Sequence, residues 1–453
     1  MRAQLTELSG WGRTSPTVAT LIDTSPAELT AAGLRSLSPD GRGVIARGLG
    51  RAYGDAAQNG GGKVVRLAPG PILLDEQAGT VTVGAGVSLD ELLRHLVPRG
   101  WFVPVSPGTR FVTIGGAVAS DIHGKNHHLD GSFGSHLDEL TMLLADGSQR
   151  AITAESEPDL WWATIGGMGL TGIILDATIR LLRIESSLCV VDTERVANLD
   201  ALIERMESGD HRYRYSVAWV DLVASGNSLG RSVLTRGDHA TISELEAEGH
   251  KAVRDPLGFD PGKLAGVPPG TPNTLSRLAV RAFNELWYRK APKDHRGLET
   301  ITGFFHPLDM VGDWNRLYGS NGFLQYQFVV PFQAVDMLRA IVERVVASGH
   351  ASFLAVLKRF GPESGGLLSF PTPGWTLTLD LPAGAAGLGA LLADLDAMVL
   401  DAGGRHYLAK DASTTPEVIR AGYPRLDEWM KIRNRVDPDG LWVSDQARRL
   451  ALV

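Results

Sequence analysis

The chain has 453 residues, which predicts two or three domains, and its 43% hydrophobic and 21% charged residues are ordinary for a globular protein. A formal net charge of −7 without a basic block argues against nucleic acid as the main partner. The single cysteine, Cys189, excludes an internal disulfide and a cysteine-rich metal site. Because the first residues lack the apolar core of a secretory signal and no apolar run approaches ~20 residues, we expect any membrane contact to be peripheral.

The first glycine-rich loop, residues 47–55 (RGLGRAYGD), follows a short buried strand predicted at 43–46. Successive N–H groups of such a loop can point one way and form an anion nest, to which Arg47 and Arg51 add charge. The sequence therefore predicts a pyrophosphate site, with a tight turn carrying a surface arginine pair as the alternative. Strands at 63–67 and within 72–87 follow, and then a helix from Ser88 to Val97 that opens with a capping box.

The second stretch, Pro104 to His128, follows a strand predicted from Trp101 to Val105. Gly115 and Gly116 let the backbone approach a flat or anionic ligand, because glycine has no Cβ. The stretch also carries short hydrogen-bonding groups and protonatable groups: Thr109, Thr113, Ser120, Asn126, His123, Lys125, His127 and His128. A surface loop with scattered histidines would look similar, but the glycine loops on either side favour a ligand site.

The third glycine loop, Gly166 to Gly172, follows a strand predicted over 137–145, a hairpin turn at Asp146-Gly147 and a helix predicted from Glu157 to Ile165. Gly167, Gly169 and Gly172 match the dinucleotide pattern G-x-G-x-x-G. That pattern needs a strand before it and a helix after it, whereas here a helix precedes it and a strand over 173–184 follows. The reversed order argues against an NAD-linked Rossmann dehydrogenase.

The sequence pattern changes after Ser187, where glycine clusters thin out and strands alternate with amphipathic helices. Strands are predicted over 213–223, 323–331, 353–361 and 375–382, with helices from Val335 to Ser348 and from Gly387 to Leu400. These segments predict an antiparallel sheet covered by helices on one face. The tail, residues 403–450, resembles the first 187 residues in its pattern, presents Lys410-Asp411 after a short apolar strand and is expected to fold back onto the first domain.

Residues 255–297 are rich in proline, glycine and basic side chains. One helical face within them is apolar, and basic residues lie elsewhere around the helix: Leu275, Leu278, Ala282, Phe283 and Leu286 against Arg277, Arg281 and Lys290. Such a helix can rest on a lipid surface. A helix packed into the core is the alternative.

Taken together, RGLGRAYGD, PGTRFVTIGGAVASDIHGKNHHLDGSFG, IGGMGLTG and YLAKD…VDPDG resemble the vanillyl-alcohol-oxidase type of FAD-binding fold. Segments such as FFHPLDMVGDWNRLYGSNGFLQYQFVVP and VLKRFG make the chain most similar to the decaprenylphosphoryl-β-D-ribose 2′-oxidase family of actinobacterial cell-wall flavoproteins. The resemblance implies an α+β, two-domain fold. Residues 1–188 and 405–453 would form the FAD-binding domain, and residues 189–404 an inserted antiparallel-sheet substrate domain.

The resemblance also implies how FAD is held. Members that attach flavin covalently have a histidine where this chain has Asp55, so non-covalent FAD is expected. The implied cofactor-binding residues are Arg47, Gly48, Leu49, Gly50, Arg51, Ala52, Tyr53, Pro107, Gly108, Thr109, Thr113, Gly115, Gly116, Ser120, Ile122, His123, Asn126, Gly167, Gly169, Gly172, Ile173, Tyr407 and Lys410.

The implied reaction is oxidation of the ribose 2′-hydroxyl of decaprenylphosphoryl-β-D-ribose to a 2′-keto intermediate, on the way to the arabinose donor for cell-wall arabinan. Lys410 and His123 are the implied catalytic residues, with Lys410 either accepting the hydroxyl proton as an amine or stabilising negative charge as an ammonium. The implied substrate-binding residues are Tyr53, His123, Lys125, Phe305, Gln325, Gln327, Lys358, Phe360, Thr376, Thr378 and Lys410. A cation such as Lys358 could pair with the substrate phosphate.

The resemblance further implies a separate NAD(P)H-dependent keto-reductase subunit as partner, and a cytoplasmic or membrane-peripheral location that leaves the periplasmic face open. Mycobacterial members have Asn and Cys where this chain has Thr376 and Thr378, and favour Tyr at Phe305. These departures leave another polyprenyl-phospho-sugar or an alditol open as substrate. A glycolipid-binding protein that keeps the fold without catalysis is a further alternative.

Overall fold

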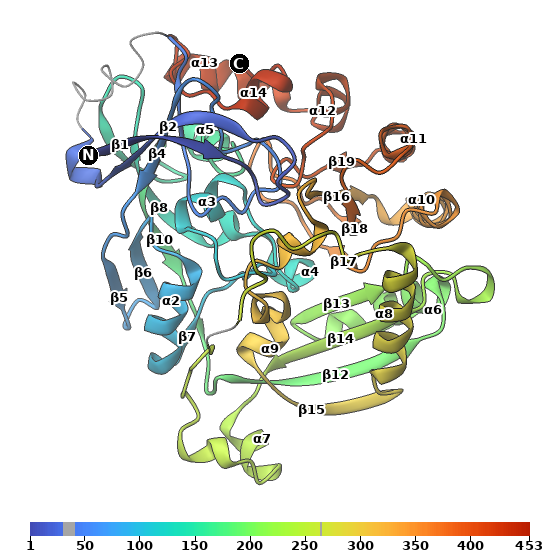
Figure 1. Ribbon diagram of the computed structural model, residues 1–453. Helices are drawn as coiled ribbons and strands as arrows, with labels where there is room; N and C mark the ends of the chain where they lie inside the picture. Colours follow the sequence, from blue (N-terminus) through green and yellow to red (C-terminus); the bar gives the residue numbers. More distant parts are fainter. Residues whose placement is uncertain (30–40, 263–264) are drawn as a thin grey trace.

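The computed structural model describes residues 1–29, 41–262 and 265–453. The first part of the chain builds a four-stranded and a five-stranded sheet, and the second part builds one eight-stranded sheet beside them (Figure 1). Helices lie between and around these sheets. The expected α+β class, with antiparallel sheets following an FAD-binding first part, is confirmed.

The four-stranded sheet carries the strand that leads into the first glycine loop. Its order is β1 (Arg2–Leu8), β2 (Thr17–Thr24), β4 (Lys63–Leu67) and β3 (Val44–Ala46). β4 runs parallel to both of its neighbours, while β1 and β2 are antiparallel. Val44 and Ile45 of β3 have no exposed surface. The first glycine loop, which begins at Arg47, therefore starts from the interior of the molecule.

The five-stranded sheet is antiparallel throughout. Its order is β5 (Ile72–Asp75), β6 (Thr80–Gly84), β10 (Ile173–Arg180), β8 (Leu137–Leu143) and β9 (Gln149–Ile152). The expected hairpin between β8 and β9 is present. β7 (Trp101–Phe102), paired with β11 (Leu182–Arg183), is shorter than the strand expected to reach Val105, because Pro104 has no N–H to donate to a ladder.

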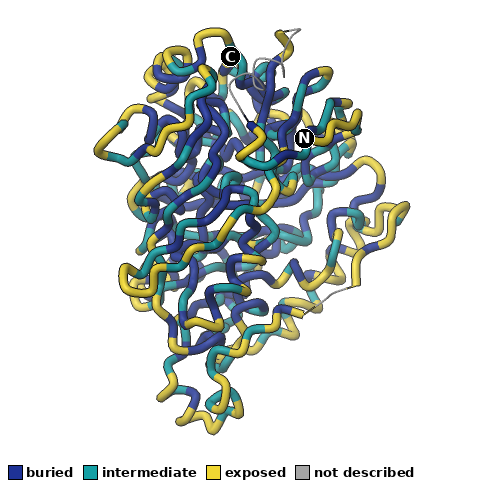
Figure 2. Tube along the Cα trace, turned by 90° about the vertical axis from the view of Figure 1, so that its left-hand side faces the viewer, coloured by how far each residue is buried: buried dark blue, intermediate teal, exposed yellow. Residues whose placement is uncertain are grey.

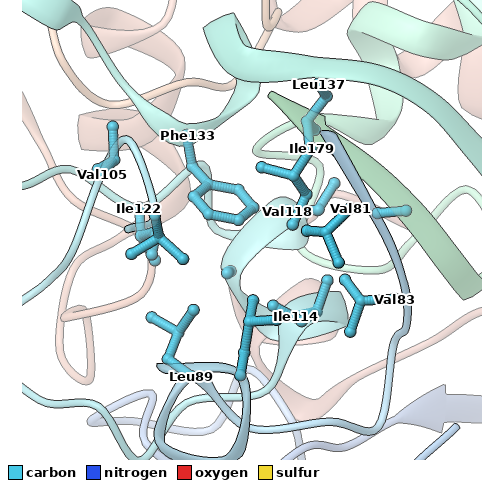
Figure 3. Packing of buried hydrophobic residues seen from close by; sticks show 14 of the residues in the cluster. Val81, Val83, Leu89, Val105, Ile114, Val118, Ile122, Phe133, Leu137 and Ile179 are labelled. Atoms are coloured by element: carbon cyan, nitrogen blue, oxygen red, sulfur yellow. The ribbon is translucent and has the colours of Figure 1, made fainter. Parts of the chain in front are cut away.

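Four helices accompany these sheets: α2 (Leu89–Leu96), α3 (Ile114–Ala119), α4 (His127–Asp130) and α5 (Pro158–Thr164). α2 begins with the expected capping box, since Ser88 Oγ accepts from the Glu91 amide and the Glu91 carboxylate accepts from the Ser88 amide at 2.8 Å. α3 packs its apolar side into a core with β6, β8 and β10, where Ile114, Val118 and Phe133 are fully buried (Figure 3). This packing holds the α3 part of the second glycine-rich stretch against the five-stranded sheet.

The eight-stranded sheet is also antiparallel. Its order is β15 (Asp294–Thr300), β12 (Leu188–Val196), β14 (Ser232–His239), β13 (Tyr215–Val220), β17 (Ala355–Phe360), β18 (Gly374–Pro382), β16 (Phe323–Val330) and β19 (Arg405–His406). α6 (Leu199–Gly209), α10 (Val335–Ser348) and α11 (Leu388–Asp401) bury their leucines and valines against one face. Because strand side chains alternate, the polar residues of β16 to β18 point from the other face.

The remaining helices surround these layers. They are α7 (Ile242–Ala247), α8 (Arg277–Lys290), α9 (Ile301–Phe305), α12 (Pro416–Gly422), α13 (Leu426–Val436) and α14 (Asp445–Arg449). The tail returns to the first part as expected, since Trp442 bridges to Val44 and Arg449 pairs with Asp55. Figure 2 shows that the buried part of the trace runs through the middle of the molecule, while exposed segments lie at its edges.

Candidate active site

A cavity of about 1590 Å³ lies between the two parts of the chain. The three glycine loops line it on one side and the polar face of the eight-stranded sheet lines it on the other. Segments far apart in the sequence therefore meet in one space that is large enough for a dinucleotide and part of a second molecule.

The first glycine loop presents free backbone donors to this cavity. Among the described residues, no atom accepts a hydrogen bond from the amides of residues 48–52, whereas the amides on either side, of Arg47 and Tyr53, bond to Val65 and Ala409. Gly48 has no room for a side chain, because a Cβ there would lie 2.2 Å from Thr113 Oγ1. Five neighbouring N–H groups without a protein partner fit the pyrophosphate of FAD.

The two arginines of this loop have different environments. Arg47 donates to the carbonyls of Ser9 (2.7 Å) and Ala57 (3.0 Å), so its side chain ties the loop to these two neighbouring segments. The guanidinium carbon of Arg51 lies 3.8 Å from the ring centroid of Trp11, and its buried Nε has no partner among the described residues. Of the two arginines, Arg51 thus keeps a donor for an anion.

The third glycine loop is held against α3. The amides of Gly166 and Met168 bond to the carbonyls of Val118 (3.1 Å) and Ala119 (2.8 Å). The loop follows α5 and precedes β10, which confirms the reversed order that argued against a Rossmann dehydrogenase. Gly172, with φ at +152°, takes a conformation that other residues rarely adopt.

His123 is the centre of the polar cluster. Its Nε2 lies 3.0 Å from Gln327 Nε2, and its Nδ1 lies 3.1 Å from Lys358 Nζ. The ring packs against Phe360, with centroids 4.7 Å apart, and against Tyr407 at 5.4 Å. Burial lowers the pKa of His123 well below 6.5, and the nearby lysine charges act in the same direction, so the ring is neutral.

Three half-buried lysines face the cavity near this cluster. Burial, followed by the charges of Lys410 and Lys125, lowers the pKa of Lys358 to about 7. Burial lowers the pKa of Lys410 to about 8 against the opposing effect of Asp380, and the pKa of Lys125 to about 8 against that of Glu299. Lys410 Nζ lies 4.0 Å from the ring centroid of Tyr53. Such pKa values suit proton exchange near neutral pH.

The segment carrying Lys410 differs from expectation. The preceding strand, β19, has only two residues, and Lys410 closes a turn in which its amide donates to the Tyr407 carbonyl at 2.9 Å. The turn is rigid because Tyr407, Leu408 and Ala409 are buried. Hydrophobic character in this segment therefore reflects a packed turn, not a strand.

Toward α8 the cavity lining is mainly apolar, with Thr235 and Lys290 as polar members. Val217, Trp219, Val356, Phe283 and Trp287 line this end. Part of the expected apolar face of α8 points to solvent, whereas Phe283 of the same face lines the cavity and contacts Phe353. Leu278 is 78% exposed and Leu286 67% exposed, while the helix packs through Val280 and Asn284. The α8 part of residues 255–297 is therefore packed on one side and exposed along Leu278 and Leu286; residues 263–264 of that segment lie outside the described residues.

Most of the predicted site residues line the cavity. They are Arg47, Gly48, Leu49, Gly50, Arg51, Ala52, Tyr53, Pro107, Gly108, Thr109, Thr113, Gly115, Gly116, Ser120, Ile122, His123, Lys125, Gly169, Gly172, Ile173, Phe305, Gln325, Gln327, Lys358, Thr378, Tyr407 and Lys410. Sequence reasoning missed Trp11 and Trp219. The alternation of β13, in which Ala218 and Val220 face the helices, could have indicated Trp219.

Four predicted residues do not line the cavity. Asn126 is fully buried and donates to Pro104 O (2.8 Å) and to Asp130. Gly167 faces the carbonyl of Ala163, which a Cβ would approach to 2.1 Å. Phe360 and Thr376 are fully buried behind His123 and Gln327, so they act on the cavity only through those side chains.

Comparison with known proteins agrees with this geometry. Residues 24–153 match an FAD binding domain family, and residues 386–450 match the D-arabinono-1,4-lactone oxidase family. The chain is 48% identical to decaprenylphosphoryl-beta-D-ribose oxidase of Mycolicibacterium smegmatis over 98% of this chain and 97% of that protein. It is 41% identical to an uncharacterised protein of Streptomyces coelicolor, over 81% and 100% of the two chains. D-arabinono-1,4-lactone oxidase of Eremothecium gossypii shares 29% identity over 30% of this chain and 25% of its own length. The chain therefore belongs to the decaprenylphosphoryl-β-D-ribose oxidase family of FAD-binding oxidoreductases.

Proposed function

We propose that this protein oxidises the ribose 2′-hydroxyl of decaprenylphosphoryl-β-D-ribose to the 2′-keto compound, with FAD held non-covalently. The observation that carries the proposal is the order of groups along one cavity. The free amides of residues 48–52 lie at the end of the cavity that the glycine loops line. His123, Lys358 and Lys410 come next along the cavity, and the mainly apolar end lies beside α8. This order matches a dinucleotide, a sugar hydroxyl and a lipid tail.

The residues around the sugar position supply what alcohol oxidation needs. FAD, when bound, supplies the two-electron acceptor that takes the hydride from the carbon bearing the hydroxyl. The hydroxyl must lose its proton to a basic group, and Lys358, Lys410 and His123 are the groups at hand. Gln325 donates to Asp380 at 2.6 Å, which fixes one wall of the sugar position.

Anaerobic reduction of the flavin tests this function directly. The purified yellow protein is mixed with decaprenylphosphoryl ribose, with other polyprenyl-phospho-pentoses and with free alditols, and loss of flavin absorbance is followed. We expect the fastest bleaching with the ribose lipid. A colourless protein, or a coloured protein that no sugar bleaches, would support a non-catalytic binding protein.

A second candidate is oxidation of another polyprenyl-phospho-sugar or of an alditol. The match of residues 386–450 to a sugar-lactone oxidase family favours it, as do threonines at positions 376 and 378. The same panel separates the candidates, because an alditol oxidase would bleach with free alditols at least as fast as with the lipid.

We further propose that α8 rests on a membrane surface and guides the lipid into the cavity. No helix among the described residues has the length and apolar character to cross a membrane. Exposed Leu278 and Leu286 lie on the helix whose Phe283 and Trp287 line the cavity. Apolar side chains beside arginines and Lys290 suit an anionic lipid surface.

Sedimentation with anionic liposomes tests the contact. Changing both Leu278 and Leu286 to Gln should reduce the bound fraction, while Leu5→Gln, at an equally exposed leucine on β1, should not. Equal binding by both variants would contradict the proposal.

Because the 2′-keto product must be reduced at the same carbon to complete an epimerisation, we also propose an NAD(P)H-dependent keto-reductase as the partner, which a copurification assay can detect.

A further inference from the structure

A chain of hydrogen bonds with one direction leads to His123. Thr376 Oγ1 donates its hydrogen to the backbone carbonyl of Phe328 at 2.8 Å. The same oxygen therefore accepts from its other neighbour, Gln327 Nε2, at 3.2 Å. The NH₂ group of Gln327 also faces His123 Nε2 at 3.0 Å, so it donates in both directions.

The opposite orientation of the Gln327 amide is unfavourable. It would place the amide oxygen against Thr376 Oγ1, whose hydrogen is already used by Phe328. Two lone pairs would then face each other between two buried side chains, where a lost hydrogen bond is costly. Thr376 thus determines which end of the Gln327 amide reaches the histidine.

The direction of this chain determines the tautomer of His123. A neutral imidazole has one N–H and one lone pair. Because Nε2 receives a hydrogen from Gln327, the ring hydrogen must be on Nδ1, which lies 3.1 Å from Lys358 Nζ. An N–H group can donate to an amine with a free lone pair, but it cannot donate to an ammonium group, which has only donors.

We propose that Thr376 and Gln327 hold His123 as the Nδ1–H tautomer, that His123 in turn holds Lys358 as a neutral amine, and that this amine accepts the proton of the substrate hydroxyl. The proposal rests on the proposed function. Rotation about the Cε–Nζ bond turns the Nζ lone pair from the His123 N–H to the hydroxyl. That pair then forms the fourth bond of Nζ, to the hydroxyl hydrogen, and Nζ becomes an ammonium. The O–H electron pair becomes the second bond between carbon and oxygen, and the hydride on the same carbon leaves to the FAD that the family carries. Lys358 thereby takes the role of base that sequence reasoning offered to Lys410.

The surroundings of Lys358 agree with this assignment. His123 faces it from the second glycine-rich stretch, His127 from α4, Lys125 from the same stretch and Lys410 from the C-terminal turn. Burial and the charges of Lys410 and Lys125 lower the pKa of Lys358 to about 7. Lys410 has the opposing influence of Asp380, so of the two it keeps its proton more readily. Two neighbouring lysines with different protonation can divide the work of base and cation.

The tautomer is tested without substrate. Protein labelled with ¹⁵N-histidine reports which ring nitrogen carries the hydrogen, and the His123 signals are identified by their absence from a His123→Gln sample. We expect Nδ1–H in the parent and in Thr376→Ser, which keeps the hydroxyl. Thr376→Val removes the hydroxyl at nearly the same volume and should give a mixture of tautomers. A hydrogen on Nε2 in the parent, or an unchanged tautomer in Thr376→Val, would overturn the proposed relay.

The role of Lys358 is tested by single-turnover flavin reduction in FAD-loaded Lys358→Arg. Arginine keeps the positive charge but cannot lose a proton. We expect the reduction rate to fall about 10²–10⁴-fold. We also expect the parent rate to rise with pH through the Lys358 titration, and that step to be missing in the variant. Lys358→Arg that reduces flavin within about tenfold of the parent would instead assign Lys358 to pairing with the substrate phosphate. A parent that no substrate reduces would refute the proposed function, while the histidine spectra would still decide the tautomer.

Discussion

Arg449 is expected to contribute several kcal/mol to stability, because it is the shared cation of two buried carboxylates. Its guanidinium makes two bonds to Asp55, of 2.7 and 3.0 Å, and one to Asp411 of 2.8 Å. It also donates to the Thr414 carbonyl at 2.8 Å. The side chains of Asp55 and Asp411 are 12% and 1% exposed, so Arg449→Met would leave two carboxylates buried without their partner.

The expected loss is about 3 kcal/mol. Removing one member of a buried pair costs roughly 3–5 kcal/mol, and the lower end applies because 28% of the Arg449 side chain reaches solvent. Urea unfolding followed by tryptophan fluorescence measures it. Arg425→Met is the matched control, since it removes an equally bidentate but exposed pair with Glu428 and should cost only ~0–1 kcal/mol. Equal midpoints for the two variants would refute the reasoning.

Three further predictions concern the cofactor and the site. Gly48→Val should lose FAD, because its Cβ would lie 2.2 Å from Thr113 Oγ1 and displace the loop. Gly389→Ala, where a Cβ meets nothing within 4 Å, is the control and should keep FAD. The flavin content of the purified proteins measures both. Acid precipitation should leave the flavin in the supernatant, because Asp55 cannot form the histidyl link, and flavin in the pellet would contradict this. Lys410→Ala should keep FAD, but the substrate should reduce the flavin about 10²–10³-fold more slowly, the usual cost of removing one charge-stabilising group. A flavin reduction rate within about tenfold of the parent would remove Lys410 from the mechanism.

The parts of the site that follow local patterns could be predicted from the sequence. The glycine loop at 47–55 combines closely spaced glycines with two arginines, a pattern that favours a close backbone approach to an anion, and its free amides line the cavity. Gln325 and Gln327, which the family resemblance implied, lie on one face of β16, with Tyr326 and Phe328 on the helix side, as strand alternation requires. The order of helix, glycine loop and strand around Gly167 was enough to set aside a Rossmann fold.

The parts that depend on tertiary contacts could not be predicted in the same way. Asn126 looks like a ligand-binding amide in sequence, but its NH₂ group is used by Pro104 and Asp130. Trp11 is far from the first glycine loop in sequence and becomes part of the site because its amide donates to the Ala52 carbonyl at 2.8 Å and Arg51 stacks on its ring. Of these contacts, that of Asn126 with Asp130 is local, whereas the contacts of Asn126 with Pro104 and of Trp11 with Arg51 join distant segments, and no local pattern carries them.

Thr376 shows how a side chain outside the cavity can still decide its chemistry. The strand pattern places it on the cavity face of β18, directly opposite Lys358 in the ladder, yet Gln327 covers it completely. From this position its hydroxyl can influence the cavity only by choosing the orientation of the Gln327 amide. The substitution at 376 relative to mycobacterial members therefore bears first on proton positions at His123 and Lys358. Thr378, which lines the cavity itself, is the position of the two that can change substrate shape directly.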